Sequence, residues 1–143
     1  MAILNFIQER DPPPNRAGHC PDGEKEKHFT EAAVMISFAL HLLESYPDAH
    51  SVRICPDGEH AKRFDIKNWL EKNGFNKTES SGSTSYGGKY VRDRHTIQVT
   101  PTSGFGDVVI ETGNENIVAE CKGGVVNAKH PDKRHAFAKG CAK

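Results

Sequence analysis

The stretch Ser103-Gly-Phe-Gly-Asp-Val-Val-Ile-Glu-Thr-Gly-Asn-Glu-Asn-Ile-Val-Ala-Glu-Cys-Lys-Gly-Gly124 contains the pattern that decides the predicted fold. Two apolar, β-branched runs, at 108–110 and 117–119, flank the segment Thr112-Gly-Asn-Glu115. A Gly-Asn pair between two apolar runs is typical of the tight turn of a β-hairpin. The sequence therefore predicts two antiparallel strands joined by this turn.

The pairing of the two strands follows from the turn. If Gly113 and Asn114 are the loop residues, Asp107 lies opposite Glu120. Side chains alternate along a strand, so Glu120 and Lys122 share one face. Two carboxylates and an ammonium group are therefore expected to converge at the open end of the hairpin.

This convergence costs free energy unless something compensates for it. Like charges opposite each other destabilise a strand pair, and two adjacent carboxylates would be forced to share a proton. A divalent cation removes both problems, and oxygen ligands suit Mg²⁺ or Mn²⁺. We therefore expect Asp107 and Glu120 to bind such a metal. Lys122 could orient or deprotonate an attacking water, or neutralise charge on a phosphorane-like transition state.

Gly106-Asp107, then twelve residues, then Glu120-Cys121-Lys122 resembles the active-site signature of the PD-(D/E)XK nuclease superfamily. The resemblance implies a restriction-endonuclease-like fold with an αβββαβ core. It also implies that Asp107 and Glu120 bind the metal, that Lys122 assists the water, and that the backbone carbonyl of Cys121 is a further metal ligand. The proline that usually precedes the aspartate is replaced by Gly106.

The segment 69–75 and the Ser/Gly-rich loop 79–88, followed by the same motif, resemble the archaeal Holliday-junction resolvase branch. That branch carries an extra acidic residue on the first core helix, which helps to hold the metal. Glu59 is the nearest candidate for this role, although it lies about one helical turn too early. Glu31, on the preceding helix, is a further candidate. The Ser/Gly loop is much longer here than in resolvases.

The expected fold class is α/β, and a length of 143 residues favours a single domain. The prolines of 11–14 belong to a loose N-terminal arm, residues 1–19. Residues 20–50 are predicted to form an N-terminal helical extension, which contains a long helix over 25–45. Residues 51–143 are predicted to form the nuclease-like α/β core.

Within this core the hydrophobic pattern predicts a series of short elements. They are a strand at 51–55, a helix at 59–73, a short strand at 75–78, the loop 79–88 and a strand at 95–100. The strand at 95–100 is expected beside the Asp107 strand, which gives a three-stranded meander. The loop 79–88 is either a surface linker or a segment that offers hydrogen-bond donors to a phosphate.

The core that the resemblance implies lacks its last strand. The chain ends at residue 143, 21 residues after Lys122, and residues 127–143 suffice only for the next helix. The expected core is therefore αβββα: either this is a truncated form, or another chain completes the sheet. The helix over 25–45 is apolar nearly all round, so it is buried on most sides or lies in a homodimer interface.

Basic residues are concentrated towards the C-terminal end. Basic and acidic residues balance at 19 each, but residues 122–143 carry a net charge of +5. Lys129, His130, Lys133 and Arg134 could steer a nucleic-acid backbone towards the metal site. A solvated helix face would explain the same pattern. No segment resembles a recognition helix, so we expect little base readout.

The N-terminus does not resemble a signal peptide, because its apolar run is short and Glu9 and Asp11 follow. The longest apolar stretch, 32–43, is too short for a membrane span. A cytoplasmic protein without membrane association is therefore expected. The four cysteines have no paired spacing, so free thiols are expected rather than disulfides or a zinc site.

Together these patterns predict a Mg²⁺- or Mn²⁺-dependent endonuclease that hydrolyses the phosphodiester bonds of DNA. The alternative is a catalytically inactive module that keeps the nuclease fold and binds nucleic acid or protein. Metal binding at Asp107 and Glu120 distinguishes the two, because an inactive module does not require it.

Overall fold

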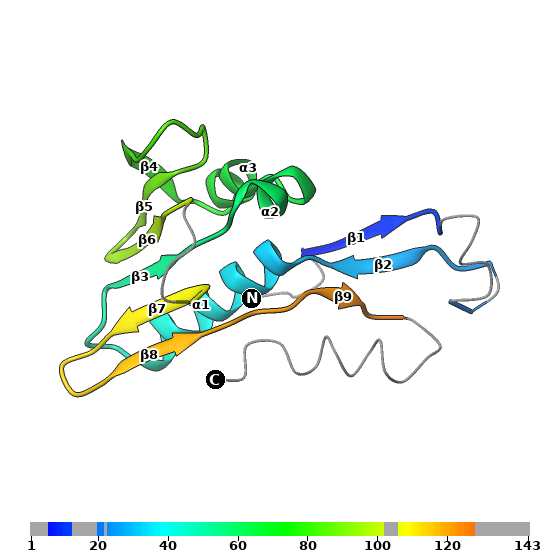
Figure 1. Ribbon diagram of the computed structural model, residues 1–143. Helices are drawn as coiled ribbons and strands as arrows, with labels where there is room; N and C mark the ends of the chain where they lie inside the picture. The colour runs from blue at the N-terminus through cyan, green and yellow to red at the C-terminus, as the bar shows by residue number, and fades with distance from the viewer. Residues whose placement is uncertain (1–5, 13–19, 22, 102–105, 128–143) are drawn as a thin grey trace.

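The computed structural model describes residues 6–12, 20–21, 23–101 and 106–127 of the chain (Figure 1). These residues form a mixed α/β fold with two sheets and three helices. In chain order the elements are β1 (Ile7–Arg10), β2 (Glu26–Phe29), α1 (Glu31–Ser45), β3 (Ser51–Ile54), α2 (Gly58–Arg63), α3 (Ile66–Lys72), β4 (Asn76–Ser80), β5 (Gly88–Arg92), β6 (His95–Val99), β7 (Val108–Glu111), β8 (Asn116–Ala119) and β9 (Gly124–Val125).

The larger sheet has six strands in the order β4-β5-β6-β3-β7-β8. β3 lies inside this sheet, where it pairs in parallel with β6 and antiparallel with β7. The remaining pairs are antiparallel. The predicted α/β class is confirmed, with a mixed rather than a purely parallel sheet.

The β7–β8 hairpin has the predicted register. Ile110 pairs with Ile117. The N–H of Thr112 donates to the carbonyl of Glu115 at 2.8 Å, which closes the turn. The hairpin could be predicted because its turn residues and its apolar alternation are adjacent in the chain.

The predicted meander of the 95–100 strand with the Asp107 strand is wrong. β6 pairs with β3, with Ile97 opposite Val52, and β3 separates β6 from β7. A parallel pair requires a long crossover, which α2, α3 and the β4–β5 hairpin supply here. Strand order depends on contacts between distant segments, so the local pattern could not reveal this crossover.

A smaller sheet, in the order β1-β2-β9, adjoins the N-terminal end of α1 (Figure 1). The loose arm predicted for 1–19 is therefore wrong over β1, which pairs along its whole length with β2. The predicted helix over 25–45 is also wrong at its start, because β2 occupies its first turn. α1 begins only at Glu31, where the side chain of Thr30 caps the helix.

The helix predicted over 59–73 is interrupted. α2 ends before Phe64, whose backbone is extended with φ −149° and ψ 124°. Asp65 then caps α3 by accepting a hydrogen bond from the N–H of Asn68 at 3.1 Å. Aspartate favours such a cap over a helix interior, which explains the break.

The Ser/Gly-rich loop predicted over 79–88 is shorter than expected. β4 and β5 form an antiparallel hairpin that encloses it, with Ser80 opposite Gly88. β5 is absent from the sequence-based prediction, because its glycine and its two basic residues obscure the alternation around buried Tyr90.

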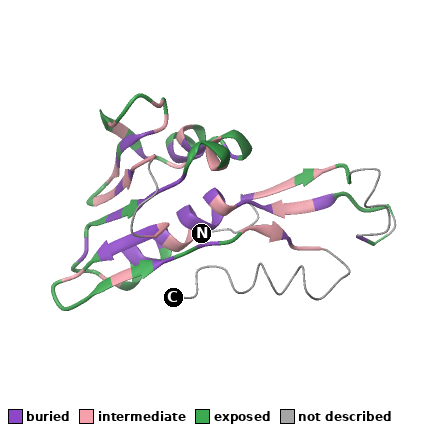
Figure 2. Cartoon of the chain, in the orientation of Figure 1, coloured by how far each residue is buried: buried purple, intermediate pink, exposed green. Residues whose placement is uncertain are grey.

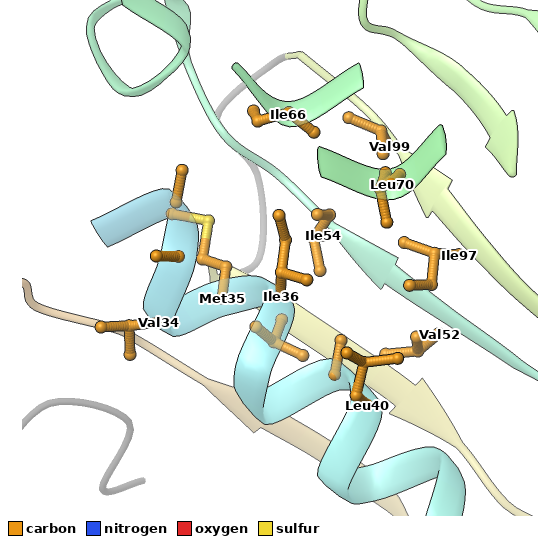
Figure 3. Close-up of a cluster of buried hydrophobic side chains, with 14 of the residues drawn as sticks. Val34, Met35, Ile36, Leu40, Val52, Ile54, Ile66, Leu70, Ile97 and Val99 are labelled. Atoms are coloured by element: carbon orange, nitrogen blue, oxygen red, sulfur yellow. The ribbon is translucent and has the colours of Figure 1, made fainter. Parts of the chain in front are cut away.

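α1 packs against the larger sheet, and most of its side chains are buried (Figures 1 and 2). Figure 3 shows Met35, Ile36 and Leu40 of α1 gathered with Val52 and Ile54 of β3. Side chains of α3 and β6 belong to the same hydrophobic cluster. The chain itself buries this helix, so its apolar surface does not require a dimer interface. The boundary predicted between a helical extension and the core runs through this shared cluster.

In the described part of the chain, no helix is long and apolar enough to cross a membrane. Three of the four cysteines, Cys20, Cys55 and Cys121, are buried, and Cys55 is a free thiol, as predicted for it. Cys141 lies outside the described residues.

We predict that Phe6→Ala lowers the free energy of unfolding by about 3–5 kcal/mol, as is usual for a buried aromatic side chain. Phe6 is 0% exposed, and its ring stacks on that of Trp69 with 4.5 Å between centroids. Urea unfolding followed by the fluorescence of Trp69 measures the change. The control is Val118→Ala, because Val118 is 39% exposed and should change stability by at most about 0.5 kcal/mol. Equal effects of the two substitutions would exclude Phe6 from the folded core.

Candidate functional site

Asp107 lies at the start of β7 and is held between the two neighbouring strands. Its N–H donates to the carbonyl of Ala119 at 2.9 Å, at the end of β8. Its own carbonyl accepts a hydrogen bond from the N–H of Cys55 at 2.8 Å, just after β3. Both backbone groups of Asp107 are therefore paired, so the sheet sets the position of this residue.

The side chain of Asp107 makes a further hydrogen bond. Its Oδ2 accepts the N–H of Cys121 at 2.7 Å, which is a short bond of the kind that carboxylate acceptors make. This bond joins the aspartate to the Glu120-Cys121-Lys122 segment, so the two halves of the predicted motif meet. The outermost residue pair of the hairpin is Val108 opposite Ala119. Asp107 and Glu120 are the next residues on the two strands, so they flank its open end. Asp107 is half-buried and Glu120 is exposed.

Lys122 lies beside the first residue of α1. Its Nζ is 3.7 Å from Oε1 of Glu31, and the two side chains are 70% and 27% exposed. Gly123 permits this approach, because a Cβ at that position would lie 2.5 Å from the carbonyl oxygen of Phe29 and 2.7 Å from the nitrogen of Glu31. A glycine is needed where two backbones pass so closely. The ion pair adds little stability because the lysine is exposed, and it places the Lys122 ammonium group beside Glu31.

The second carboxylate oxygen of Glu31 contacts α2. Nε2 of His60 lies 2.5 Å from Oε2 of Glu31. Nδ1 of the same ring accepts the N–H of Asp57 at 3.1 Å, so Nε2 carries the hydrogen that is donated to Glu31. The Asp57 carboxylate accepts the N–H of His60 in return, which completes a capping box. That N–H is the main reason why the pKa of the Asp57 carboxyl lies below its usual range.

Glu59, the predicted additional metal ligand, does not lie at this site. Its carboxylate pairs with Lys62 at 3.2 Å on the exposed side of α2. Glu31 is the helix acid that reaches the motif instead, because α1 rather than α2 packs beside β7. The sequence contained one signal for this, since Thr30-Glu31 is a capped helix start with an acid in its first turn.

Gly106 departs from the resembled signature for a conformational reason. Its φ is +107°, whereas a proline ring fixes φ near about −65°. A Cβ at this position would also lie 2.6 Å from Cγ1 of Val118. The approach to Asp107 therefore requires glycine in this chain, and proline could not take its place.

The buried thiol of Cys55 is a poor nucleophile at this site. Burial is the main cause that raises the pKa of the Cys55 thiol, whose N–H bonds to Asp107. The thiol therefore keeps its proton near neutral pH, and the thiolate rather than the thiol is reactive. The carboxylates and the lysine, rather than the Cys55 thiol, are the groups at this site suited to hydrolytic chemistry.

The site offers oxygen donors to a metal ion. They are the carboxylates of Asp107 and Glu120, the carbonyl of Cys121 and the carboxylate of Glu31, which contacts Lys122. Within residues 6–12, 20–21, 23–101 and 106–127, no three His, Cys, Asp or Glu side chains form a metal-binding group. Mg²⁺ is nevertheless often held by one or two carboxylates and keeps several waters. The residues therefore fit Mg²⁺ or Mn²⁺ by the chemistry of their donors.

The predicted nucleic-acid-binding residues Lys129, His130, Lys133 and Arg134 lie outside the described residues. No protein-family model matches the chain, and no curated protein or solved structure matches it either. Its function therefore has to be inferred from the geometry of the site.

We predict that Gly106→Ala destabilises the protein by about 1–3 kcal/mol, because alanine is strained at positive φ and its Cβ meets Val118. Gly113→Ala is the matched control in the same hairpin. A Cβ at Gly113 has nothing within 4 Å, so this substitution should be neutral or stabilising by up to about 1 kcal/mol. Urea midpoints of both variants measure the difference. A Gly106→Ala midpoint equal to that of Gly113→Ala would contradict the strain argument.

Proposed function

We propose that the chain is a Mg²⁺- or Mn²⁺-dependent endonuclease acting on DNA, built on a restriction-endonuclease-like core. The order α1–β3–β7–β8 supports this, since a helix is followed by three adjacent antiparallel strands. That is the αβββ order of the resembled core. α2, α3 and β4–β6 are then an insertion between its first two strands. In this assignment the core helix is α1, in place of the helix predicted over 59–73.

The observation that carries the proposal is the hydrogen bond from the Cys121 N–H to Oδ2 of Asp107. It links two motif segments that are separated by the whole hairpin, at the edge where Lys122 meets Glu31. A carboxylate, a second carboxylate next to Cys121, and a lysine are thereby held by one backbone framework. A surface hairpin with scattered charges would not require this arrangement.

The residues would divide the work of phosphodiester hydrolysis. Asp107, Glu120 and the Cys121 carbonyl would hold Mg²⁺ or Mn²⁺, which when bound activates water and offsets charge on the phosphate. Lys122, with its exposed ammonium group, would orient the water or neutralise charge that develops on the phosphate. Glu31 would keep Lys122 at the edge of the site, and His60 would fix the carboxylate of Glu31.

The alternative function is a catalytically inactive module of the same fold that binds nucleic acid or protein. One observation favours it: among the described residues no group of three metal-ligating side chains is assembled. Such a module would keep the hydrogen bond between Asp107 and Cys121 for stability alone. Metal binding therefore decides between the two proposals.

We predict that the protein binds Mn²⁺ in calorimetry and nicks supercoiled plasmid, and that Asp107→Asn loses both. Asparagine keeps an acceptor oxygen for the Cys121 N–H but loses the negative charge, so the variant should unfold at nearly the same urea concentration. The control is Glu115→Gln, which removes an exposed acid at the turn end of the same hairpin. It should bind Mn²⁺ and nick plasmid like the unchanged protein.

The outcomes separate the alternatives. Loss of binding and nicking in Asp107→Asn, with both kept in Glu115→Gln, supports a metal-dependent nuclease. Mn²⁺ binding without nicking in the unchanged protein supports a metal-binding but inactive form. No Mn²⁺ binding by the unchanged protein would overturn the nuclease proposal and favour the interaction module.

We predict a second contrast, between Glu31→Gln and Glu59→Gln. Removing a residue that orients the groups of a metal site typically lowers metal affinity or activity by about 10–100-fold. Glu31→Gln should show a loss of that size in the nicking rate, because it releases Lys122. Glu59→Gln should leave the rate unchanged, since Glu59 pairs only with exposed Lys62 among the described residues. Equal rates for both variants would exclude Glu31 from the site.

A further inference from the structure

A cleft lies between the two short helices and the turn that joins β4 to β5. Its walls include Lys62 and Arg63 of α2, Lys67 of α3, and residues 84–86 of the turn. Its volume is about 780 Å³, within the usual size range of ligand pockets in proteins. All of its described lining residues belong to the insertion between β3 and β7. Figure 1 shows α2, α3 and the β4–β5 hairpin of this insertion together.

The charge on the walls of this cleft is positive. Lys62, Arg63 and Lys67 contribute three positive charges, and Asp65 is the acidic residue among the described lining residues. One carboxylate oxygen of Asp65 is already engaged as the cap of α3. Two other clefts lined by described residues lack this excess, since one combines Asp48 and Glu111 with Arg53, and the other Asp65 with Lys72. A ligand of this cleft is therefore expected to be an anion.

The basic side chains are available to such a ligand. Lys62 pairs with Glu59 at 3.2 Å, but both side chains are about two-thirds or more exposed, at 76% and 69%. Lys67 pairs with Glu71 at 3.7 Å, at 44% and 48% exposure. Exposed pairs of this kind hold their partners weakly, so exchanging them for a phosphate costs little. The guanidinium group of Arg63 has no ion pair within the described part of the chain.

The turn opposite the helices supplies polar and aromatic groups. Ser85 is exposed, with its hydroxyl available as a donor. Thr84 accepts the N–H of Gly87 at 3.1 Å through its Oγ1, which leaves its O–H free to donate. The ring of Tyr86 is half-buried on the wall, and its hydroxyl donates to the carbonyl of Pro56 at 3.5 Å. Hydroxyl donors and basic groups are the usual contacts to a phosphate backbone, and an aromatic ring beside them accepts a base by stacking.

The helix α2 connects this cleft to the carboxylates. Its His60 binds Glu31, while Lys62 and Arg63 of the same helix line the cleft. A helix with its side chains is about 10–12 Å across. The distance between the cleft and the site of Glu31 and Lys122 is therefore of the order of one helix diameter, which a polynucleotide strand can span.

We propose that this cleft binds the phosphodiester backbone of a nucleic-acid strand and holds it across α2 next to the carboxylate site. The part that concerns the carboxylate site rests on the proposed nuclease function, whereas strand binding by the cleft does not. The insertion then supplies an electrostatic contact with the strand. The ligand contacts are to phosphate, so binding depends on salt and little on base sequence.

The test is binding of a fluorescein-labelled 20-nucleotide single strand, measured by anisotropy in EDTA at several salt concentrations. The cleft variant combines Lys62→Gln, Arg63→Gln and Lys67→Gln. The matched control combines Lys25→Gln, Lys89→Gln and Arg94→Gln, which removes the same charge from exposed positions outside the cleft. The cleft variant should bind the strand at least about tenfold more weakly than the control. The slope of log affinity against log salt concentration should become shallower by an amount equivalent to about two phosphate contacts. Equal affinities of the two triple variants would overturn the proposal.

A second pair of variants avoids any change in the helices. Ser85→Asp places a negative charge in the cleft, whereas Ser83→Asp places it on the same turn away from the cleft. Ser85→Asp should weaken binding several-fold more than Ser83→Asp. A nucleoside monophosphate that binds as tightly as the 20-mer would identify a mononucleotide pocket and contradict strand binding.

Failure of this proposal is distinguishable from failure of the nuclease proposal. The binding assay contains no metal, so an inactive module can still give the expected result. Conversely, the cleft variant should bind Mn²⁺ as the unchanged protein does, because Lys62 and Lys67 pair with Glu59 and Glu71 and not with the carboxylates of the site. Loss of Mn²⁺ binding in the cleft variant would show that its effect is a general disruption of the fold, and would count against the cleft.

Discussion

Hydrogen bonds at Asp107 hold together the parts of the molecule on which the candidate site depends. Its N–H bonds to β8, its carbonyl bonds to the N–H of Cys55 after β3, and its carboxylate bonds to the N–H of Cys121. Each bond joins segments that are distant in sequence or separated by the hairpin. A buried or half-buried backbone group is costly to leave unpaired, so these bonds favour this arrangement of the three segments. Together they fix the position of Asp107 at the edge that carries Glu120 and Lys122.

The second constraint is the burial of α1. The apolar side chains of this helix are buried in one cluster with those of the larger sheet and α3. This packing places Glu31, the first residue of the helix, against Gly123. The glycine allows two backbones to meet, and the meeting brings Lys122 to the glutamate. His60 reaches the same carboxylate from the inserted helix. One acidic side chain thereby connects the hairpin, the central helix and the insertion, which is why the proposed site and the proposed strand-binding cleft are neighbours.

The parts of the fold that could be predicted are those whose determinants lie close together in the chain. The turn at Gly113-Asn114 and the flanking apolar runs specify a hairpin within one short segment, and its register is as predicted. The strand at Ser51–Ile54 and the helix end at Asn73-Gly74 follow from equally local signals. The break at Phe64 escaped prediction although Asp65 is a local capping signal, and β5 escaped it because its glycine and basic residues obscure the alternation around buried Tyr90.

By itself, the sequence determined the motif, its hairpin and the chemical character of the side chains at its end, since these depend on residue type and short spacing. The tertiary structure alone decided that β3 lies between β6 and β7, and that Glu31 rather than Glu59 meets Lys122. It also decided that Lys62, Arg63 and Lys67 face the turn of the β4–β5 hairpin across one cleft. The physical reason is the same in each case. Contacts between distant segments form where the whole core packs best, and no local pattern encodes which of several apolar strands and helices become neighbours.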